Sequence, residues 1–138
     1  MSKPTVKYQD GYKNFLCESY KDKVAIYPGK GIKTDYGSLD EKGNVEIYRK
    51  FVWDGCSGPT ITTKTTIRGG LLHDFLYRLM KHGLLGSSWR EQADKEFKIR
   101  LLEDRCNRFR AWYFHFSVVA FGVSSINPKN RKKVKTAP

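Results

Sequence analysis

The chain has 138 residues, of which 39% are hydrophobic and 14% aromatic, so a disordered chain is excluded and one folded domain over residues 1–126 is predicted. The formal net charge of +12 makes the protein basic. The three cysteines, Cys17, Cys56 and Cys106, form no CxxC pair, which argues against a zinc site or a disulfide framework.

Short strands are predicted for the first half of the chain. Residues 15–54 alternate apolar and polar side chains and are interrupted by the turn-like sequences PGKG, at 28–31, and EKGN, at 41–44. This pattern predicts two to four antiparallel strands. We interpret Tyr27-Pro28-Gly29-Lys30-Gly31 as a hairpin turn, and Gly43-Asn44 as a second turn.

The sequence WDGCSGPTI, residues 53–61, follows the last predicted strand and has two interpretations. Asp54 and Ser57, with a proline two residues after the serine, favour an Asx-type turn that closes the strand. The alternative is that Asp54 and Ser57 place a carboxylate and a hydroxyl at the mouth of a site. Because Ser57 lacks the G-x-S-x-G setting of a nucleophile elbow, acyl-serine chemistry is not proposed.

Helical spacing begins at about Thr66. Apolar residues recur at three and four positions over 67–82, and Ser88 with Glu91 predicts a capping box for a second helix over 89–104. The short connection predicts that these two helices are antiparallel and share a core. The residues expected in that core are Leu72, Leu76, Leu79, Phe97 and Leu101. With a third helix over 107–121, strands followed by helices make an α+β fold.

The third predicted helix is apolar over residues 111–123, which is shorter than the roughly 20 residues that a bilayer span requires. A buried core helix is the first interpretation. The second is an interfacial helix flanked by Arg108 and Arg110, because aromatic rings favour the depth of lipid headgroups. No transmembrane span is expected in either case.

Polar residues inside the first apolar helix raise the question of a site. His73 and Tyr77 are four residues apart and share a helix face, and the antiparallel second helix can bring Asp94 opposite them. A carboxylate that binds one imidazole nitrogen leaves the other free as a general base. The alternative is a buried polar pair that ties two helices together, which is the commoner role of such pairs.

The C-terminal residues 127–138 are predicted to be a flexible basic tail that binds an anionic partner. The tail carries five cations and no acid: Lys129, Arg131, Lys132, Lys133 and Lys135. Such a charge attracts phosphate on nucleic acid, phospholipid or lipopolysaccharide, and the sequence leaves these partners open.

Three motifs in order resemble a family of short phage and prophage proteins of unknown function. They are D-x-x-S-x-P at residues 54–59, HDxxY at 73–77 and ADxxF at 93–97, and the resemblance covers about residues 45–122. The resemblance implies a phage-encoded protein that is made in the host cytoplasm. If it is a virion protein, it is then carried in the phage particle.

HDxxY followed by ADxxF also resembles the active-site helices of secreted and parvoviral phospholipases of the A2 type. The resemblance implies that His73 is the base, that Asp94 orients it, that Tyr77 supports the pair and that Asp74 binds calcium. Residues 27–31 match the Y-x-G-x-G calcium loop of that group. The loop lies farther from His73 than in the viral enzymes, and the disulfides of the secreted members are absent.

Two functions are therefore expected. The first is a calcium-dependent hydrolase acting on a phospholipid ester or a cell-wall bond of the host envelope, during invasion of the host or its lysis. The second is a non-catalytic virion or accessory protein whose His-Asp cluster is structural, and whose basic surface binds nucleic acid or neighbouring virion subunits.

Overall fold

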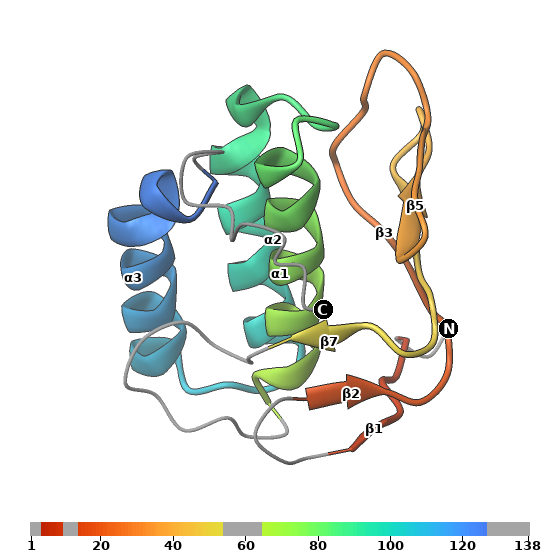
Figure 1. The fold of residues 1–138 in the computed structure, drawn as a ribbon. Coiled ribbons are helices and arrows are strands. Elements are labelled where there is room, and N and C mark those ends of the chain that lie inside the picture. Colours follow the sequence, from red (N-terminus) through yellow and green to blue (C-terminus); the bar gives the residue numbers. More distant parts are fainter. Residues whose placement is uncertain (1–3, 10–13, 54–64, 127–138) are drawn as a thin grey trace, which may run out of the picture.

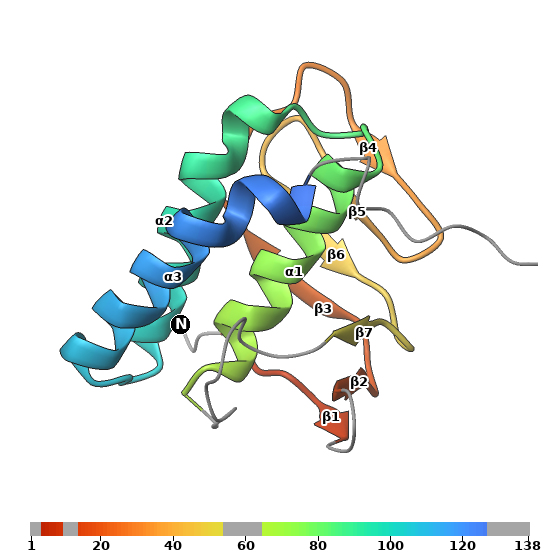
Figure 2. The ribbon, with the colours of Figure 1, turned by 60° about the vertical axis from the view of Figure 1, so that its left-hand side comes forward.

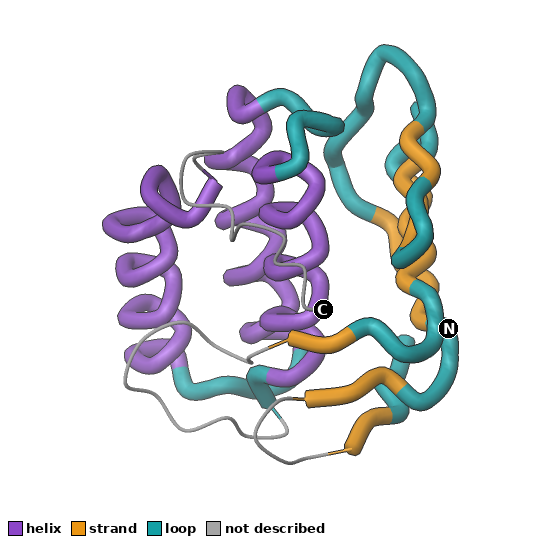
Figure 3. Tube along the Cα trace, in the orientation of Figure 1, coloured by secondary structure: helices purple, strands orange, loops and turns teal. Residues whose placement is uncertain are grey.

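A computed structural model of the chain describes residues 4–9, 14–53 and 65–126, with side chains to Ala120 (Figure 1). The first half forms short strands and the second half forms three helices, in two groups that lie side by side (Figure 3). The predicted α+β class is confirmed. Asp54, Ser57 and the C-terminal tail lie outside the described residues.

The strands are two to four residues long and make two antiparallel sheets. The three-stranded sheet has the order β1 (Tyr8–Gln9), β2 (Asn14–Leu16), β7 (Val52–Trp53). The four-stranded sheet has the order β3 (Tyr20–Lys23), β6 (Asn44–Ile47), β5 (Gly37–Leu39), β4 (Ile32–Lys33). The prediction of two to four strands was too low, because bends and turns end each strand after a few residues.

The turn at Gly43-Asn44 is confirmed as the hairpin between β5 and β6. The Asp40 carboxylate accepts hydrogen bonds from the backbone N–H groups of Lys42 and Asn44, at 2.8 and 2.9 Å. Gly43 has a φ of 86°, and a Cβ there would lie 2.1 Å from the carbonyl oxygen of Val24. Only glycine fits both the conformation and the space.

The interpretation of residues 27–31 as a hairpin turn was wrong. The preceding strand, β3, and the following strand, β4, occupy opposite edges of the four-stranded sheet. The connection therefore crosses from one edge of the sheet to the other, as Figure 2 allows the reader to follow. Sequence alone identified a turn-rich segment but could not assign the partners of the strands on either side.

Three helices follow: α1 (Ile67–Lys81), α2 (Arg90–Glu103) and α3 (Arg108–Ile126). A short 3₁₀ helix, Ser87–Trp89, precedes α2, so the predicted capping box is wrong: Trp89 is the N-cap and makes no side-chain cap bond. The third helix continues past Gly122, since an interior glycine weakens a helix without ending it. Among the described residues, none of the helices has both the length and the hydrophobicity to cross a bilayer.

The helices α1 and α2 are antiparallel, as predicted, but the expected shared core is divided into two clusters. Leu72, Leu76 and Leu79 belong to the larger cluster, which α1 forms with the strands. Phe97 and Leu101 belong to a second cluster with α3, formed with Ala111, Phe114, Val118 and Cys106. Both α1 and α2 contact the first half of the chain, and one face of α1 completes the main core while another faces α2.

Candidate functional site

The candidate site lies where α1 faces α2. His73 and Tyr77 are one turn apart on α1, and Asp94 lies opposite on α2. Gly69, one turn before His73, permits close approach of the helices, because a Cβ there would lie 3.1 Å from the Phe97 ring. This short separation lets the short Asp94 side chain reach α1.

The predicted contact between His73 and Asp94 is confirmed. His73 Nε2 lies 2.9 Å from Asp94 Oδ1, and the Tyr77 hydroxyl donates to the same oxygen at 2.5 Å. A carboxylate oxygen can accept two hydrogen bonds, so Asp94 Oδ1 can accept from His73 as well as from Tyr77. We therefore assign to His73 the tautomer with its proton on Nε2. The Nδ1 of His73 then holds the basic lone pair.

Aromatic contacts fix the orientation of the imidazole. The His73 ring lies 4.0 Å from the Tyr77 ring and 5.1 Å from the Phe97 ring, measured between centroids. Burial, and then the hydrogen bond to the Asp94 carboxylate, raise the pKa of Tyr77 far above its ordinary value. Tyr77 therefore remains a hydrogen-bond donor to Asp94 across the physiological pH range.

The second oxygen of Asp94 connects the site to α3. Asp94 Oδ2 is buried and, within the described structure, has no direct hydrogen-bond partner. Arg90 Nη1 lies 3.9 Å away and donates to the carbonyl oxygen of Val119 on α3, at 3.1 Å. One cluster of side chains thus links α1, α2 and α3, and sequence reasoning missed Arg90, whose i,i+4 spacing to Asp94 could have revealed it.

The cluster is enclosed. His73 is 5% exposed and Asp94 is 1% exposed, while Asp74 is half-buried. A cavity of about 380 Å³ in the described structure lies elsewhere, between residues 4–8 and the start of α1 at Ile67 and Arg68. A general base needs access to water, and the low exposure of His73 shows no open cleft beside it among the described residues.

The other site residues expected from the sequence remain predictions. Asp54 and Ser57 lie outside the described residues, as does the tail with its five cations. Within the described ranges, no three His, Cys, Asp or Glu side chains are grouped so as to hold a metal ion, and calcium at Asp74 remains a prediction.

A second charged cluster, which sequence reasoning also missed, joins β3 to the helices. Arg100 of α2 donates to Asp22 and Glu96, at 2.9 and 3.0 Å, and Arg68 of α1 pairs with Glu103 and Asp104. The i,i+4 spacing of Glu96 and Arg100 was visible in the sequence. The connection of Arg100 to a strand 77 to 78 residues earlier was not, because it depends on tertiary structure.

Comparison of the chain with protein-family models, with curated proteins and with solved structures found no match in any of the three. The resemblances to the phage family and to the A2 phospholipases therefore rest on the quoted motifs alone.

Proposed function

We propose that the protein is a phage-encoded hydrolase that cleaves an ester, with His73 as general base. The observation that carries the proposal is the pair of hydrogen bonds at Asp94 Oδ1, from His73 Nε2 at 2.9 Å and from the Tyr77 hydroxyl. This arrangement orients an imidazole and leaves Nδ1 to accept a proton. The phospholipase resemblance assigns the same roles to these three residues.

The chemistry follows from the tautomer. His73 Nδ1 removes a proton from water, and the water oxygen attacks the carbonyl carbon of the ester. Asp94 stabilises the imidazolium through the Nε2–H bond. The imidazolium then returns the proton to the departing alkoxide as the carbon–oxygen bond breaks. The resemblance adds calcium at Asp74, which would polarise the carbonyl group, but we assign no step to a metal.

The proposed substrate is a phospholipid ester, and its proposed location is the host envelope. An ester of the host envelope, in a phospholipid, fits the phospholipase resemblance, and the net charge of +12 favours an anionic surface around the substrate.

The burial of the cluster favours a second candidate function. His73 and Asp94 are enclosed, and together with Arg90 they connect all three helices. A cluster of this kind stabilises a fold without catalysing a reaction. In that case the protein is a non-catalytic virion or accessory protein whose basic surface binds nucleic acid or neighbouring subunits.

Two substitutions separate the candidates when melting and hydrolysis are measured on the same samples. The hydrolase proposal predicts that His73→Gln lowers the hydrolysis of phosphatidylglycerol vesicles and of a short-chain chromogenic ester by about 100-fold or more. Asp94→Asn should lower it as well. His115→Gln is the matched control, because it makes the same change at a histidine of α3 outside the hydrogen-bonded pair, and it should retain activity.

Each assay is run with calcium and with a chelator, so that dependence on a metal is measured rather than assumed. The hydrolase proposal fails if the wild-type protein cleaves none of the substrates in either condition, while both variants melt at much lower temperature than the wild type. That combination would establish the structural role.

A further inference from the structure

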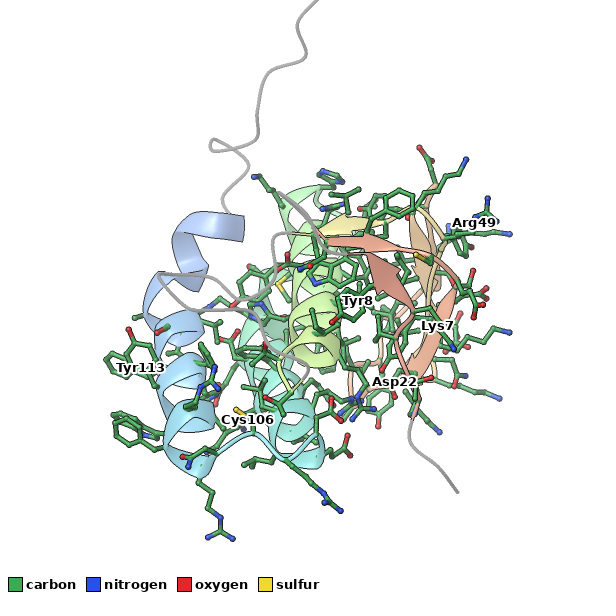
Figure 4. All side chains as sticks on the ribbon, turned by 90° about the horizontal axis from the view of Figure 1, so that it is seen from below. Lys7, Tyr8, Asp22, Arg49, Cys106 and Tyr113 are labelled. Atoms are coloured by element: carbon green, nitrogen blue, oxygen red, sulfur yellow. The ribbon has the colours of Figure 1, made fainter. Side chains whose placement is uncertain are left out.

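The helix α3 has an apolar face that no described part of the chain covers. Ala111, Phe114 and Val118 face the core and are at most 4% exposed. Five large apolar residues on the other side are 41–72% exposed: Phe109, Trp112, Tyr113, Phe116 and Val119. We call these five residues the outer face of α3, and Figure 4 shows its Tyr113 on the side of α3 that points away from the other helices.

The outer face is continuous. At 100° per residue, its five residues span an arc of about 120°, centred opposite the buried residues, and extend over roughly 15 Å of helix. The Trp112 ring stacks on the Phe116 ring, with 5.8 Å between the ring centroids, and its centroid lies 6.2 Å from that of Phe109. Single exposed apolar residues are ordinary on a protein surface, but a contiguous row of aromatic rings marks an interaction surface.

The charges around the outer face identify the kind of partner. Arg105 and Arg108 are exposed at the start of α3, and Arg110 lies beside the row with its guanidinium 5.4 Å from the Phe114 ring. The sequence from Arg105 to Ala120 contains no acid. A second copy with its α3 parallel to this one would bring these arginines against each other, whereas an anionic surface would pair with them.

We propose that the outer face of α3 binds an anionic lipid surface, with the helix lying parallel to the membrane plane. Aromatic rings with flanking arginines are the features of helices that lie at the headgroup boundary. The face projects from the outermost helix of the three, and a lipid surface can adapt to such a convex row. This surface would place the proposed hydrolase on its substrate, but the inference rests on α3 alone.

Nucleic acid fits the outer face less well. Binding of single strands uses the free faces of separated rings. Here Trp112 and Phe116 stack on each other with an angle of 21° between their planes, so part of their faces is already in contact.

The test is co-sedimentation of the full chain with vesicles of phosphatidylcholine alone, or with about one third phosphatidylglycerol, in the presence of chelator. We expect binding to the anionic vesicles. The double variant Trp112→Ser, Phe116→Ser should weaken it roughly tenfold or more, because two large apolar groups no longer enter the interface. Leu84→Ser is the control, since Leu84 is 48% exposed but lies outside α3, and it should bind as the wild type does.

Every other outcome overturns the proposal. Equal binding of the double variant and the wild type would place the lipid contact elsewhere. If the double variant binds vesicles normally but loses oligonucleotide binding, the outer face of α3 binds nucleic acid. If it binds vesicles normally but loses a dimer that analytical ultracentrifugation detects in the wild type, the face binds a second copy. Melting curves of each variant confirm that it is folded. Because no turnover is measured, the result is independent of whether the protein is a hydrolase.

Discussion

Replacing Arg100 with methionine should strongly destabilise the protein, because this residue neutralises two buried carboxylates. Arg100 is 5% exposed, and its guanidinium donates to Asp22, to Glu96 and to the carbonyl oxygen of Lys23, at 2.9, 3.0 and 2.6 Å. Methionine keeps most of the length and the apolar stem of the side chain. The substitution therefore removes the charge and the hydrogen bonds while leaving the space largely filled.

The magnitude follows from what the two carboxylates retain. Asp22 still accepts from the Tyr20 hydroxyl and lies 3.8 Å from Arg68 Nη1, and Glu96 still accepts from the Ala25 N–H at 2.8 Å. Removing one partner of a buried ion pair costs about 3–5 kcal/mol, and these remaining contacts place the loss near 3 kcal/mol. For a chain of this length, that corresponds to a fall of roughly 10 °C in melting temperature.

Urea unfolding followed by circular dichroism measures the free energy of unfolding directly. Lys95→Met is the matched control, because it removes one positive charge from the same helix, at a residue whose side chain is 56% exposed and pairs with the exposed Glu91. It should cost less than about 1 kcal/mol. If Arg100→Met and Lys95→Met destabilise the protein equally, the cluster at Asp22 does not hold β3 against the helices.

Three further predictions concern pH, a turn and the tail. Burial alone raises the pKa of Asp22, but hydrogen bonds from Arg100 and Tyr20 outweigh it and hold that pKa below its ordinary value. The contribution of Asp22 to stability is therefore present above the unfolded-state pKa of about 3.9 and is lost as the pH falls further. Urea titrations should show a smaller acid-induced loss of stability in Arg100→Met than in the wild type. Gly43→Ala should destabilise by about 1–3 kcal/mol more than Gly83→Ala in the same assay, because both glycines have positive φ, of 86° and 74°, but only the first Cβ would meet backbone atoms. Deletion of residues 127–138 should weaken binding to DNA or anionic vesicles and flatten its salt dependence, because five cations are removed; unchanged binding would locate the anionic partner on the rest of the chain.

The α+β class and the two antiparallel helices could be predicted because local patterns determine them. Apolar residues at three- and four-residue spacing predicted α1 within a residue of its observed end at Lys81, and Gly43-Asn44 predicted the β5–β6 turn. Strand partners could not be predicted. The pairing of β2 with β7, and the crossing of residues 24–31 between sheet edges, depend on contacts between distant residues rather than on local pattern.

The same distinction applies to the site. The spacing of His73 and Tyr77 on one helix, and the antiparallel return of the next, was sufficient to predict that Asp94 reaches them. Sequence could not reveal that the cluster is enclosed, since exposure depends on how α3 lies against α1 and α2. Nor could it reveal that α3 presents one face to the core and an equally apolar face to solvent, because residues 111–123 are apolar around much of the helix.

The role of His73 as a base depends most directly on which of its ring nitrogens carries the proton. Nitrogen-15 NMR of the imidazole, at a pH where His73 is neutral, distinguishes the two tautomers by their chemical shifts and one-bond proton couplings, and His73→Gln assigns the signals. We predict a proton on Nε2, donated to Asp94, and an unprotonated Nδ1. In Tyr77→Phe the Nε2 proton should remain, since Asp94 Oδ1 still lies 2.9 Å from Nε2 to accept it. A proton on Nδ1 with Nε2 unprotonated would contradict the account, because Asp94 would then be the donor and His73 would have no lone pair available to act as a base.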